Sequence, residues 1–300
     1  MTGYTLLVNP VCGGGSGAVA AESVARTLRG AGHDATITPT PGVRETHGLV
    51  DDAVARGDVI VLVGGDGTLS SVAGRVAARG GTLGIVPAGR GNDFARMLGL
   101  PTAPAAAAEV LLSGSPKTVD LLQVTIPGGE PRVVAGSAYS GLDARAGEIV
   151  GSVRWMPVRL QYPYSALHAM ATYRPARFRV SVDGDGAEYV GSSVVVANSA
   201  YYGNGMKIAP GAVVDDGLLD VVIIEAESRR KLMRSLPKVY QGAHVDLPGV
   251  HVLRGQRVEV TASPRVSVGG DGEPVGRLPG LAEPPAVVEV LPGALTVLLG

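Results

Sequence analysis

Residues 59–69, Val-Ile-Val-Leu-Val-Gly-Gly-Asp-Gly-Thr-Leu, decide the fold of this chain. Five consecutive apolar residues, four of them β-branched, predict a strand buried on both faces, as in the parallel sheet of an α/β domain. Such sheets bind ligands beyond the carboxyl ends of their strands, where Asp66 stands here. Gly64, Gly65 and Gly67 would permit positive φ and bring backbone N–H groups close to a phosphate. Asp66 suits a bridging divalent cation or a hydroxyl that loses its proton, although a plain Gly-Asp-Gly surface turn explains the stretch equally well.

Composition indicates a strand-rich globular protein that is long enough for two domains. Of the 300 residues, 45% are hydrophobic and 18% charged, and 44 glycines and 21 prolines suit many tight turns. The net charge of −1 gives no case for nucleic-acid binding. A single cysteine, Cys12, excludes an internal disulfide and fits a reducing compartment such as the cytoplasm. No apolar run approaches the roughly 20 residues that span a bilayer, so a lipid substrate would be reached from outside the membrane.

Strands and helices alternate on either side of the central stretch, over residues 1–117. This alternation predicts a doubly wound, mostly parallel sheet. Strands are predicted over residues 4–9, 33–39, 59–63 and 82–86, and helices over residues 19–28, 44–56, 69–79, 94–98 and 102–112.

The first glycine loop in chain order follows the first strand, so the loop at residues 64–68 is the second. The first loop runs from Pro10 through Gly13 and Gly15 to Ser16 and leads into a helix. This order presents backbone amides and a helix N-terminus to an anion. The loop lacks a Walker lysine and the spacing of a dinucleotide fingerprint, so an ordinary crossover turn is an equal alternative.

A third glycine loop, residues 87–96, follows the strand at residues 82–86. Its glycines again allow close approach of the backbone. Asn92 and Asp93 can cap the next helix or bind a ribose or phosphate, and capping is the favoured interpretation for Asp93 taken alone.

The alternation ends near Thr118. Strand-like runs joined mostly by Gly, Asp and Pro turns predict a β-sandwich or distorted barrel over residues 118–285. The runs lie at residues 118–125, 132–137, 177–183, 188–197, 218–224, 257–262 and 265–268, with helices at 163–173 and 228–239. Two last strands, 287–290 and 294–299, separated by a Pro-Gly turn, are expected to return residues 286–300 to the first domain.

Together, the three glycine loops resemble the diacylglycerol kinase catalytic domain family, which includes soluble bacterial diacylglycerol kinases and relatives acting on sphingosine, ceramide and phosphatidylglycerol. The resemblance covers nearly the whole chain. The matching segments are Asn9-Pro10 with the following glycines and residues 64–68, 87–96, 141–144, 216–220, 242–244 and 271–273. It implies a doubly wound α/β nucleotide-binding domain of the NAD kinase and phosphofructokinase type, followed by a β-sandwich domain for the lipid.

The resemblance implies an ATP- and Mg²⁺-dependent kinase that phosphorylates the hydroxyl of a membrane lipid, above all diacylglycerol. Asp66 would bind the catalytic Mg²⁺ and Asp216 a structural one, with Asp120 and Asp143 in a water network around the latter. The residues implied in nucleotide and phosphate binding are Asn9, Pro10, Gly13, Gly15, Ser16, Gly64, Gly65, Gly67, Thr68, Gly89, Arg90, Asn92 and Asp93.

Two departures from the family pattern stand in the phosphate loops. Arg90 occupies a position that usually holds threonine, and the first loop has no lysine. Because arginine is a good bidentate partner for phosphate, Arg90 is expected to replace the missing charge.

The general base implied by the resemblance is Glu273, with Asp271 orienting it, in the segment Gly269-Gly270-Asp271-Gly272-Glu273. Asp66 is the rival base, and the sequence leaves this choice open. His244 is predicted to be a structural histidine instead of a catalyst.

The predicted partner is a membrane lipid reached by peripheral contact. Residues 153–178 interleave arginines with Trp155, Met156 and tyrosines, which suits the headgroup level of an anionic bilayer, although a helix with arginines in water explains them equally. The basic cluster at residues 229–234 is explained more simply by a solvent-exposed helix. We expect a cytoplasmic protein at the inner face of the membrane, and a homodimer is left open.

Two other functions compete with the lipid kinase. An NAD kinase shares Gly-Gly-Asp-Gly and a sandwich domain, but an Asn-Glu pair would be expected where this chain has Asn92-Asp93. A nucleotide-binding sensor that lost catalysis would explain the two departures. It would need neither Asp66 nor Glu273.

Overall fold

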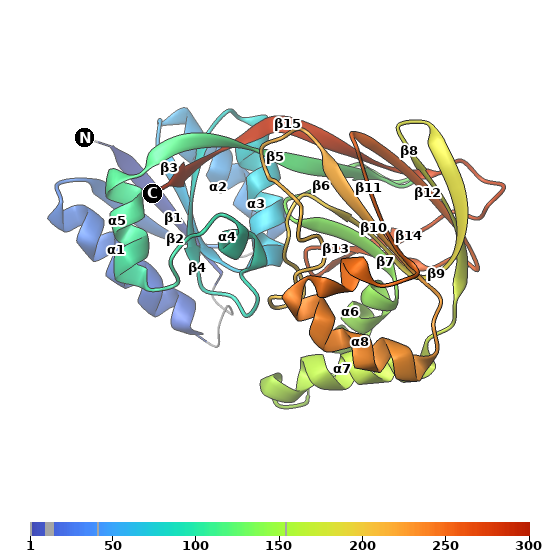
Figure 1. The fold of residues 1–300 in the computed structure, drawn as a ribbon. Helices are drawn as coiled ribbons and strands as arrows, with labels where there is room; N and C mark the ends of the chain where they lie inside the picture. The colour runs from blue at the N-terminus through green and yellow to red at the C-terminus, as the bar shows by residue number, and fades with distance from the viewer. Residues whose placement is uncertain (1, 10–14, 41, 154) are drawn as a thin grey trace. The chain divides into compact units, whose positions relative to one another are not determined.

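The structure is a computed structural model that describes residues 2–9, 15–40, 42–153 and 155–300 (Figure 1). The chain forms two compact units. Unit 1 comprises residues 1–121, 214–216 and 291–300, and unit 2 comprises residues 122–213 and 217–290. The boundary predicted after residue 117 falls inside strand β5 (Ser115–Thr125), and the C-terminal segment joins unit 1 from residue 291 instead of residue 286.

Unit 1 is built on a parallel sheet with the strand order β2-β1-β3-β4, to which the end of β15 adds in parallel through Thr296 and Val297. Its strands are β1 (Gly3–Val8), β2 (Asp34–Pro39), β3 (Val59–Gly64), β4 (Thr82–Pro87) and the second half of β15 (Ala286–Leu299). The apolar stretch that decided the fold is β3, at the centre of the sheet, where all but its first residue are buried. The predicted α/β architecture is confirmed.

Helices cover both faces of this sheet. They are α1 (Ser16–Gly30), α2 (Val43–Ala55), α3 (Asp66–Ala78), α4 (Asp93–Met97) and α5 (Pro104–Ser113). Helices α1 and α5 pack together, as do α2 and α3 (Figure 1). Alternate residues of β1, namely Tyr4, Leu6 and Val8, join the core that contains the buried alanines and leucines of α1 and α5.

Helix α3 begins at Asp66, three residues earlier than predicted. Gly65 is its N-cap, with an extended backbone at φ −119° and ψ −179°. The carboxylate of Asp66 lies in the first turn, where the helix dipole favours a negative charge. The Gly-Asp-Gly-Thr sequence is therefore the start of a helix and not a free turn.

An ion-pair fork joins α2 and α3 at the surface of unit 1. Arg75 and Arg79 both bind the carboxylate of Asp51, with 2.8 Å between Arg79 Nη2 and Asp51 Oδ2. Hydrogen bonds from Arg79 and Arg75 hold the pKa of Asp51 well below its ordinary value.

Unit 2 is antiparallel, with the strand order β14-β13-β7-β9-β8-β12-β15 and with β10 joining β9 to β11. Strand β9 changes partner along its length, from β8 over residues 185–191 to β7 over residues 193–197, as a strand at the corner of a sandwich does. The strands are β6 (Arg132–Val134), β7 (Ser137–Gly141), β8 (Ala176–Val182), β9 (Asp185–Ala197), β10 (Leu219–Glu225), β11 (Val250–Gly255), β12 (Arg257–Ser263), β13 (Ser267–Gly270) and β14 (Glu273–Arg277).

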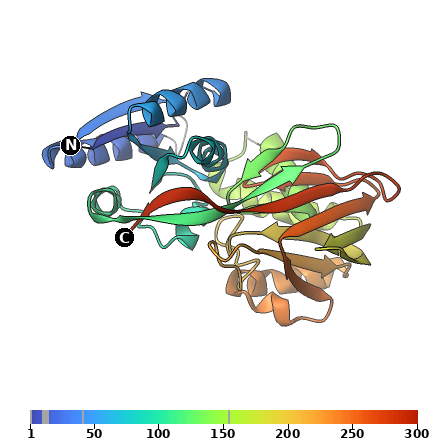
Figure 2. The same ribbon diagram turned by 90° about the horizontal axis from the view of Figure 1, so that it is seen from above.

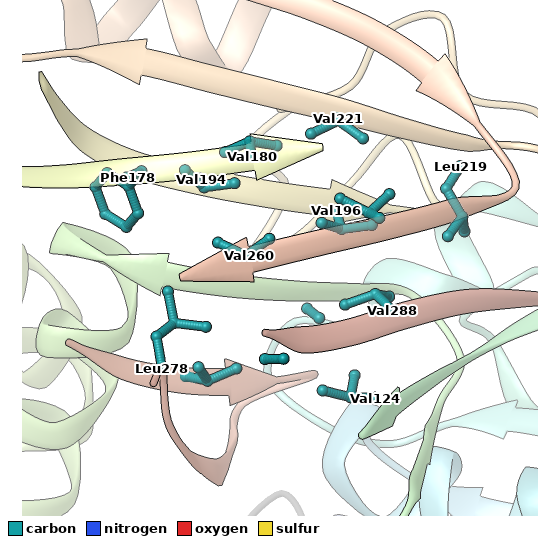
Figure 3. Packing of buried hydrophobic residues seen from close by; sticks show 14 of the residues in the cluster. Val124, Phe178, Val180, Val194, Val196, Leu219, Val221, Val260, Leu278 and Val288 are labelled. Atoms are coloured by element: carbon teal, nitrogen blue, oxygen red, sulfur yellow. The ribbon is translucent and has the colours of Figure 1, made fainter. Parts of the chain in front are cut away.

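The core of unit 2 is a valine-rich layer from these strands (Figure 3). Phe178, Val194, Leu219 and Val260 point into it, each 4% exposed or less. Outside the core, α6 (Leu142–Ser152), α7 (Val158–Thr172), α8 (Arg229–Gln241) and the 3-10 helix η2 (Ala243–Asp246) form a helical layer, in which α6 contacts α7 and α7 contacts α8. Among the described residues, no helix has the length and apolar character needed to span a membrane.

The sequence reading of unit 2 missed several elements. Strand β7, with the sequence Ser-Ala-Tyr-Ser-Gly, contains no β-branched residue, and β14 contains a proline and a glycine, so neither carries a strand pattern. The Pro-Gly turn predicted near the C-terminus is wrong, because β15 is one strand from Ala286 to Leu299 that runs beside β5 (Figure 2). Within this strand, Gly293 has φ +56°, a value that favours glycine.

Candidate active site

The glycine loops of unit 1 follow strands that are neighbours in the sheet. Val8 of β1 pairs with Val63 of β3, and Gly64 of β3 pairs with Pro87 of β4. Because these strands are parallel, the loops that follow them emerge at one edge. The predicted site residues Pro10 and Gly13, with Cys12, lie outside the described residues.

Asn9 ties the end of β1 to the start of α3. Its Nδ2 atom donates a hydrogen bond to Thr68 Oγ1 at 3.1 Å, and its backbone N–H reaches Val63 O at 3.4 Å. On the other side of the described gap, Gly15 has φ +102° and Ser16 begins α1. A φ of this value favours glycine at position 15. Asn9 and Thr68, two predicted phosphate ligands, thus form one polar pair.

The glycines of the second and third loops allow the two loops to pack backbone against backbone. A Cβ atom on Gly89 would lie 2.5 Å from the Cα of Gly65, and one on Gly65 would lie 3.0 Å from the Cα of Gly89. The expectation of positive φ is wrong here, since Gly65 has φ −119°, Gly64 ends β3 and Gly67 lies within α3. Close interloop contact explains these glycines instead.

Asp66 caps helix α4 from a different element. Its Oδ1 atom accepts a hydrogen bond from the backbone N–H of Phe94 at 3.1 Å. Asn92 occupies the N-cap position with φ 52°, and its side chain makes no cap bond. That side chain bonds the backbone of Gly89 twice, accepting from the N–H at 2.8 Å and donating to the carbonyl oxygen at 3.1 Å. Asp66 therefore ties the third loop to the second, and Asn92 braces the third loop internally.

Asp66 and Asp93 bring two carboxylates to one glycine. A Cβ atom on Gly91 would lie 2.9 Å from Asp66 Oδ2 and 3.0 Å from Asp93 Oδ2. Asp93 is only 6% exposed, and the nearest guanidinium nitrogen of Arg96 lies 3.6 Å from its Oδ1 atom. Mg²⁺ takes one or two carboxylates and completes its shell with water and phosphate oxygens, so this pair fits the ion. The resemblance implies nucleotide binding by Asp93; because the loops after the parallel strands β3 and β4 meet at one edge of the sheet, the same sequence also pairs Asp93 with Asp66.

The third loop carries two arginines, Arg90 and Arg96. Arg90 is exposed in the third loop.

No cluster of three or more His, Cys, Asp or Glu side chains able to hold a metal occurs within the described part of the chain.

Asp216 lies in a bend three residues before the start of β10 and is grouped with unit 1. Asp120, almost fully buried in β5, accepts a hydrogen bond from Gly293 N at 2.7 Å and donates its own N–H to Val214 O at 2.6 Å. Asp120 thus fixes the chain two residues before Asp216. A structural metal at Asp216 stays a prediction.

The candidate base Glu273 opens strand β14 in unit 2, directly after a tight turn. Asp271 at φ 45° and Gly272 at φ 88° make this turn the type expected of a two-residue hairpin. The Asp271 carboxylate accepts three backbone hydrogen bonds, from Ala135, Gly136 and Ser137, at 2.9 to 3.0 Å. Both of its oxygens therefore brace the hairpin, a different role from the predicted orientation of Glu273, whose side chain is exposed.

His244 is buried in η2, and its Nε2–H donates to the carbonyl oxygen of Ile208 at 3.0 Å. Burial lowers the pKa of His244, which favours the neutral ring. Asp143, in the first turn of α6, accepts a hydrogen bond from the Tyr202 hydroxyl at 2.8 Å.

The chain is similar to known proteins over almost its whole length. Residues 3–124 match the diacylglycerol kinase catalytic domain, and residues 136–299 match the YegS C-terminal NAD kinase beta sandwich-like domain. A diacylglycerol kinase of Mycobacterium tuberculosis is 34% identical over 299 residues, covering 98% of this chain and 94% of that protein. One from Bacillus subtilis is 28% identical over 241 residues, covering 78% and 77%.

The fold is also found in a solved structure of a diacylglycerol kinase from Bacillus anthracis. It has a TM-score of 0.75 at 21% sequence identity and covers 99% of this chain and 97% of that chain. The fold and the family resemblance expected from the sequence are therefore confirmed. The chain belongs to the family of bacterial diacylglycerol kinases and YegS-like lipid kinases.

Proposed function

We propose that this lipid kinase transfers the γ-phosphoryl group of ATP, with Mg²⁺, to the free hydroxyl of diacylglycerol. The observation that carries the proposal is the convergence of Asp66 and Asp93 beside Gly91 in the glycine loops. The relatives from Mycobacterium and Bacillus described above are named as diacylglycerol kinases, which supports this acceptor.

Unit 1 would bind the phosphates through its backbone. Asp66 and Gly67, in the first turn of α3, have N–H groups without an intrahelical acceptor, and the helix dipole points its positive end the same way. Asp66 Oδ1 is held by Phe94 N, which aims Oδ2 at the space beside Gly91. Asp66 and Asp93 would hold Mg²⁺ there, and the ion would neutralise the phosphate oxygens when bound. Arg90 would add the charge that the first loop lacks.

Glu273 is the proposed general base. It would accept the proton of the lipid hydroxyl while that oxygen attacks phosphorus. Asp271 serves it indirectly, since three backbone hydrogen bonds fix the turn from which Glu273 projects. Asp66 is less suited to this role, because one of its oxygens already accepts a backbone N–H and the other shares its space with Asp93.

Peripheral membrane contact would be made by α7 and α8. Leu160, Tyr164 and Leu167 follow helical spacing on α7 and are 47%, 41% and 55% exposed, and nearby Trp155 is 81% exposed. Helix α8 packs beside α7 and carries five basic and no acidic residues, namely Arg229, Arg230, Lys231, Arg234 and Lys238. An apolar stripe beside a cationic helix suits an anionic bilayer. Arg154, one of the arginines in the predicted membrane-contact stretch, lies outside the described residues. A cytoplasmic location at the inner face of the membrane stays a prediction, and so does a homodimer.

The test is transfer of label from γ-labelled ATP to mixed micelles of diacylglycerol, sphingosine, ceramide or phosphatidylglycerol, beside NAD, with Mg²⁺ or with a chelator. We expect label in diacylglycerol, a Mg²⁺ requirement, and losses of about 10² to 10⁴ in kcat for Glu273→Gln. Asp66→Asn and Asp93→Asn should raise the Mg²⁺ concentration needed. Glu130→Gln is the matched control for Glu273→Gln, because Glu130 is also an exposed glutamate of unit 2.

Other outcomes would redirect the assignment. Label in NAD would replace the lipid acceptor with a nucleotide. Nucleotide binding without transfer to any acceptor would support a sensor. Label in sphingosine alone would keep the kinase and change its lipid.

A further inference from the structure

The ring of Tyr139 packs against the hairpin that carries Glu273. Tyr139 belongs to β7 and pairs with Gly269 of β13, one arm of this hairpin. A Cβ atom on Gly269 would lie 2.5 Å from Cε2 of the ring and 3.1 Å from the hydroxyl oxygen. Glycine at position 269 therefore leaves the space that the tyrosine ring occupies.

The two residues of the turn are docked on β7. They lie outside the ladder of β13 with β14, which closes at the pair of Gly270 with Glu273. The N–H of Asp271 donates to the carbonyl oxygen of Ser137 at 3.2 Å. The N–H of Gly272, the residue directly before Glu273, donates to the Tyr139 hydroxyl oxygen at 3.0 Å.

The two halves of the turn are held by different groups. The Asp271 carboxylate accepts the three N–H groups of residues 135–137. Asn198, fully buried directly after β9, braces this segment by donating to two of its carbonyl oxygens, at 2.8 and 2.9 Å. Asp271 therefore anchors the first half of the turn, and Tyr139 anchors the second half, which leads into Glu273.

Tyr139 itself is held by packing on a strand. It is 9% exposed and belongs to a core cluster with Val195, Ile208 and Val222. Its ring centroid lies 5.7 Å from that of Tyr202. A side chain locked in a core and carried by a strand positions its polar atom more precisely than a loop residue does. The hydroxyl oxygen is thus a fixed point for the turn.

We propose that Tyr139 is a positioning residue for Glu273: its hydroxyl group holds the N–H of Gly272 and so sets the place at which Glu273 meets the lipid hydroxyl. The proposal rests on the role of Glu273 as base in the proposed function. Tyr139 acts through the main chain of the turn and takes no part in the proton transfer itself. Because a base must lie within hydrogen-bond reach of its proton, a displaced turn slows phosphate transfer without weakening ATP binding by unit 1.

The first test is Tyr139→Phe, which removes the hydroxyl group and keeps the ring. We expect kcat to fall by about tenfold, between the roughly twofold effect of a weak hydrogen bond and the roughly hundredfold effect of a 1 Å displacement, with KM for ATP unchanged. Tyr4→Phe is the matched control, because the Tyr4 hydroxyl also makes a buried hydrogen bond, to the carbonyl oxygen of Leu111 at 3.0 Å in unit 1. It should keep the parent kcat.

Amide hydrogen exchange at Gly272, followed by NMR, reports the hydrogen bond without phosphate transfer. Tyr139→Phe should accelerate this exchange by about tenfold, and Tyr4→Phe should leave it unchanged. Gly269→Ala is a second, independent perturbation, since its methyl group displaces the ring and with it the hydroxyl group. It should accelerate the same exchange and lower kcat.

A double variant separates positioning from a general structural effect. Added to Glu273→Gln, Tyr139→Phe should lower kcat by less than about twofold, because no base is left to position. The proposal is overturned if the loss is again about tenfold, or if Tyr139→Phe alone keeps the parent kcat or the parent exchange rate at Gly272. Full activity of Glu273→Gln would refute the base assignment in the proposed function. An inactive Glu273→Gln beside a fully active Tyr139→Phe would refute the positioning role alone.

Discussion

The substitution Gly89→Ala tests whether contact between two backbones holds the phosphate loops in place. The added Cβ atom would lie 2.5 Å from the Cα of Gly65 and 2.9 Å from Asn92 Oδ1. Backbone cannot rotate away as a side chain can, so the loops must separate by about 1 Å to reach ordinary contact. Overpacking of this kind costs about 1 to 3 kcal/mol. The shift also moves Asp93 away from Asp66, so phosphate transfer should fall further than stability.

Gly48→Ala is the matched control. Gly48 lies inside α2 with open space around its Cβ position, so alanine should stabilise the protein by about 0.4 to 1 kcal/mol. Urea unfolding followed by circular dichroism, beside the kinase assay, separates the two variants. If Gly89→Ala unfolds at the same urea concentration as the parent chain and retains its activity, the loops have room for a side chain and the interpretation is refuted.

Three further predictions follow from other contacts. Asp271→Ala should destabilise the protein by about 2 to 4 kcal/mol in urea unfolding, because three backbone N–H groups lose their acceptor, and Asp271→Asn should lie between it and the parent chain. Asp51, whose pKa is lowered in the folded state, stabilises the fold above its ordinary pKa of about 4 and loses this effect as pH falls through the lower folded value. The difference in thermal midpoint between the parent chain and Asp51→Asn should therefore be present at neutral pH and shrink in acid; a pH-independent difference would contradict this. Arg230→Gln with Arg234→Gln should weaken sedimentation with anionic vesicles by about 30-fold at low salt, at about 1 kcal/mol per charge, and should not affect neutral vesicles.

Most of unit 1 could be predicted from the sequence because its signals are local. Three of its strands, β1, β3 and β4, are buried along nearly their whole length, and each leads through a glycine loop to a helix, so the order of these elements follows without tertiary information. The chemistry at the loop ends depended on contacts between loops. Asn92 and Asp93 sit at the start of a helix, where capping is the natural expectation, and only the fold shows that Asp66 accepts the N–H of Phe94 there.

Unit 2 was harder to predict because its functional positions are set by distant partners. The three N–H groups bound by Asp271 lie more than 130 residues earlier in the chain. Asp143 and His244 lie 101 positions apart in the sequence and meet only as walls of one pocket. Neither periodicity nor composition carries information of this kind.

The environments of the two key carboxylates explain why their proposed roles differ. Asp66 is held by a backbone N–H and shares its space with Asp93, so its geometry is fixed by main-chain packing and suits a cation. Glu273 is exposed on a hairpin whose turn is fixed by Asp271 and Tyr139, so its side chain can reach a hydroxyl that arrives with the lipid. Tyr139 also contacts Tyr202, and the Tyr202 hydroxyl donates to Asp143, so a series of side-chain contacts within unit 2 leads from Asp143 to the turn before Glu273. A phosphate site built from backbone and an acceptor site built from side chains would let members of this family change their lipid while keeping the transfer chemistry.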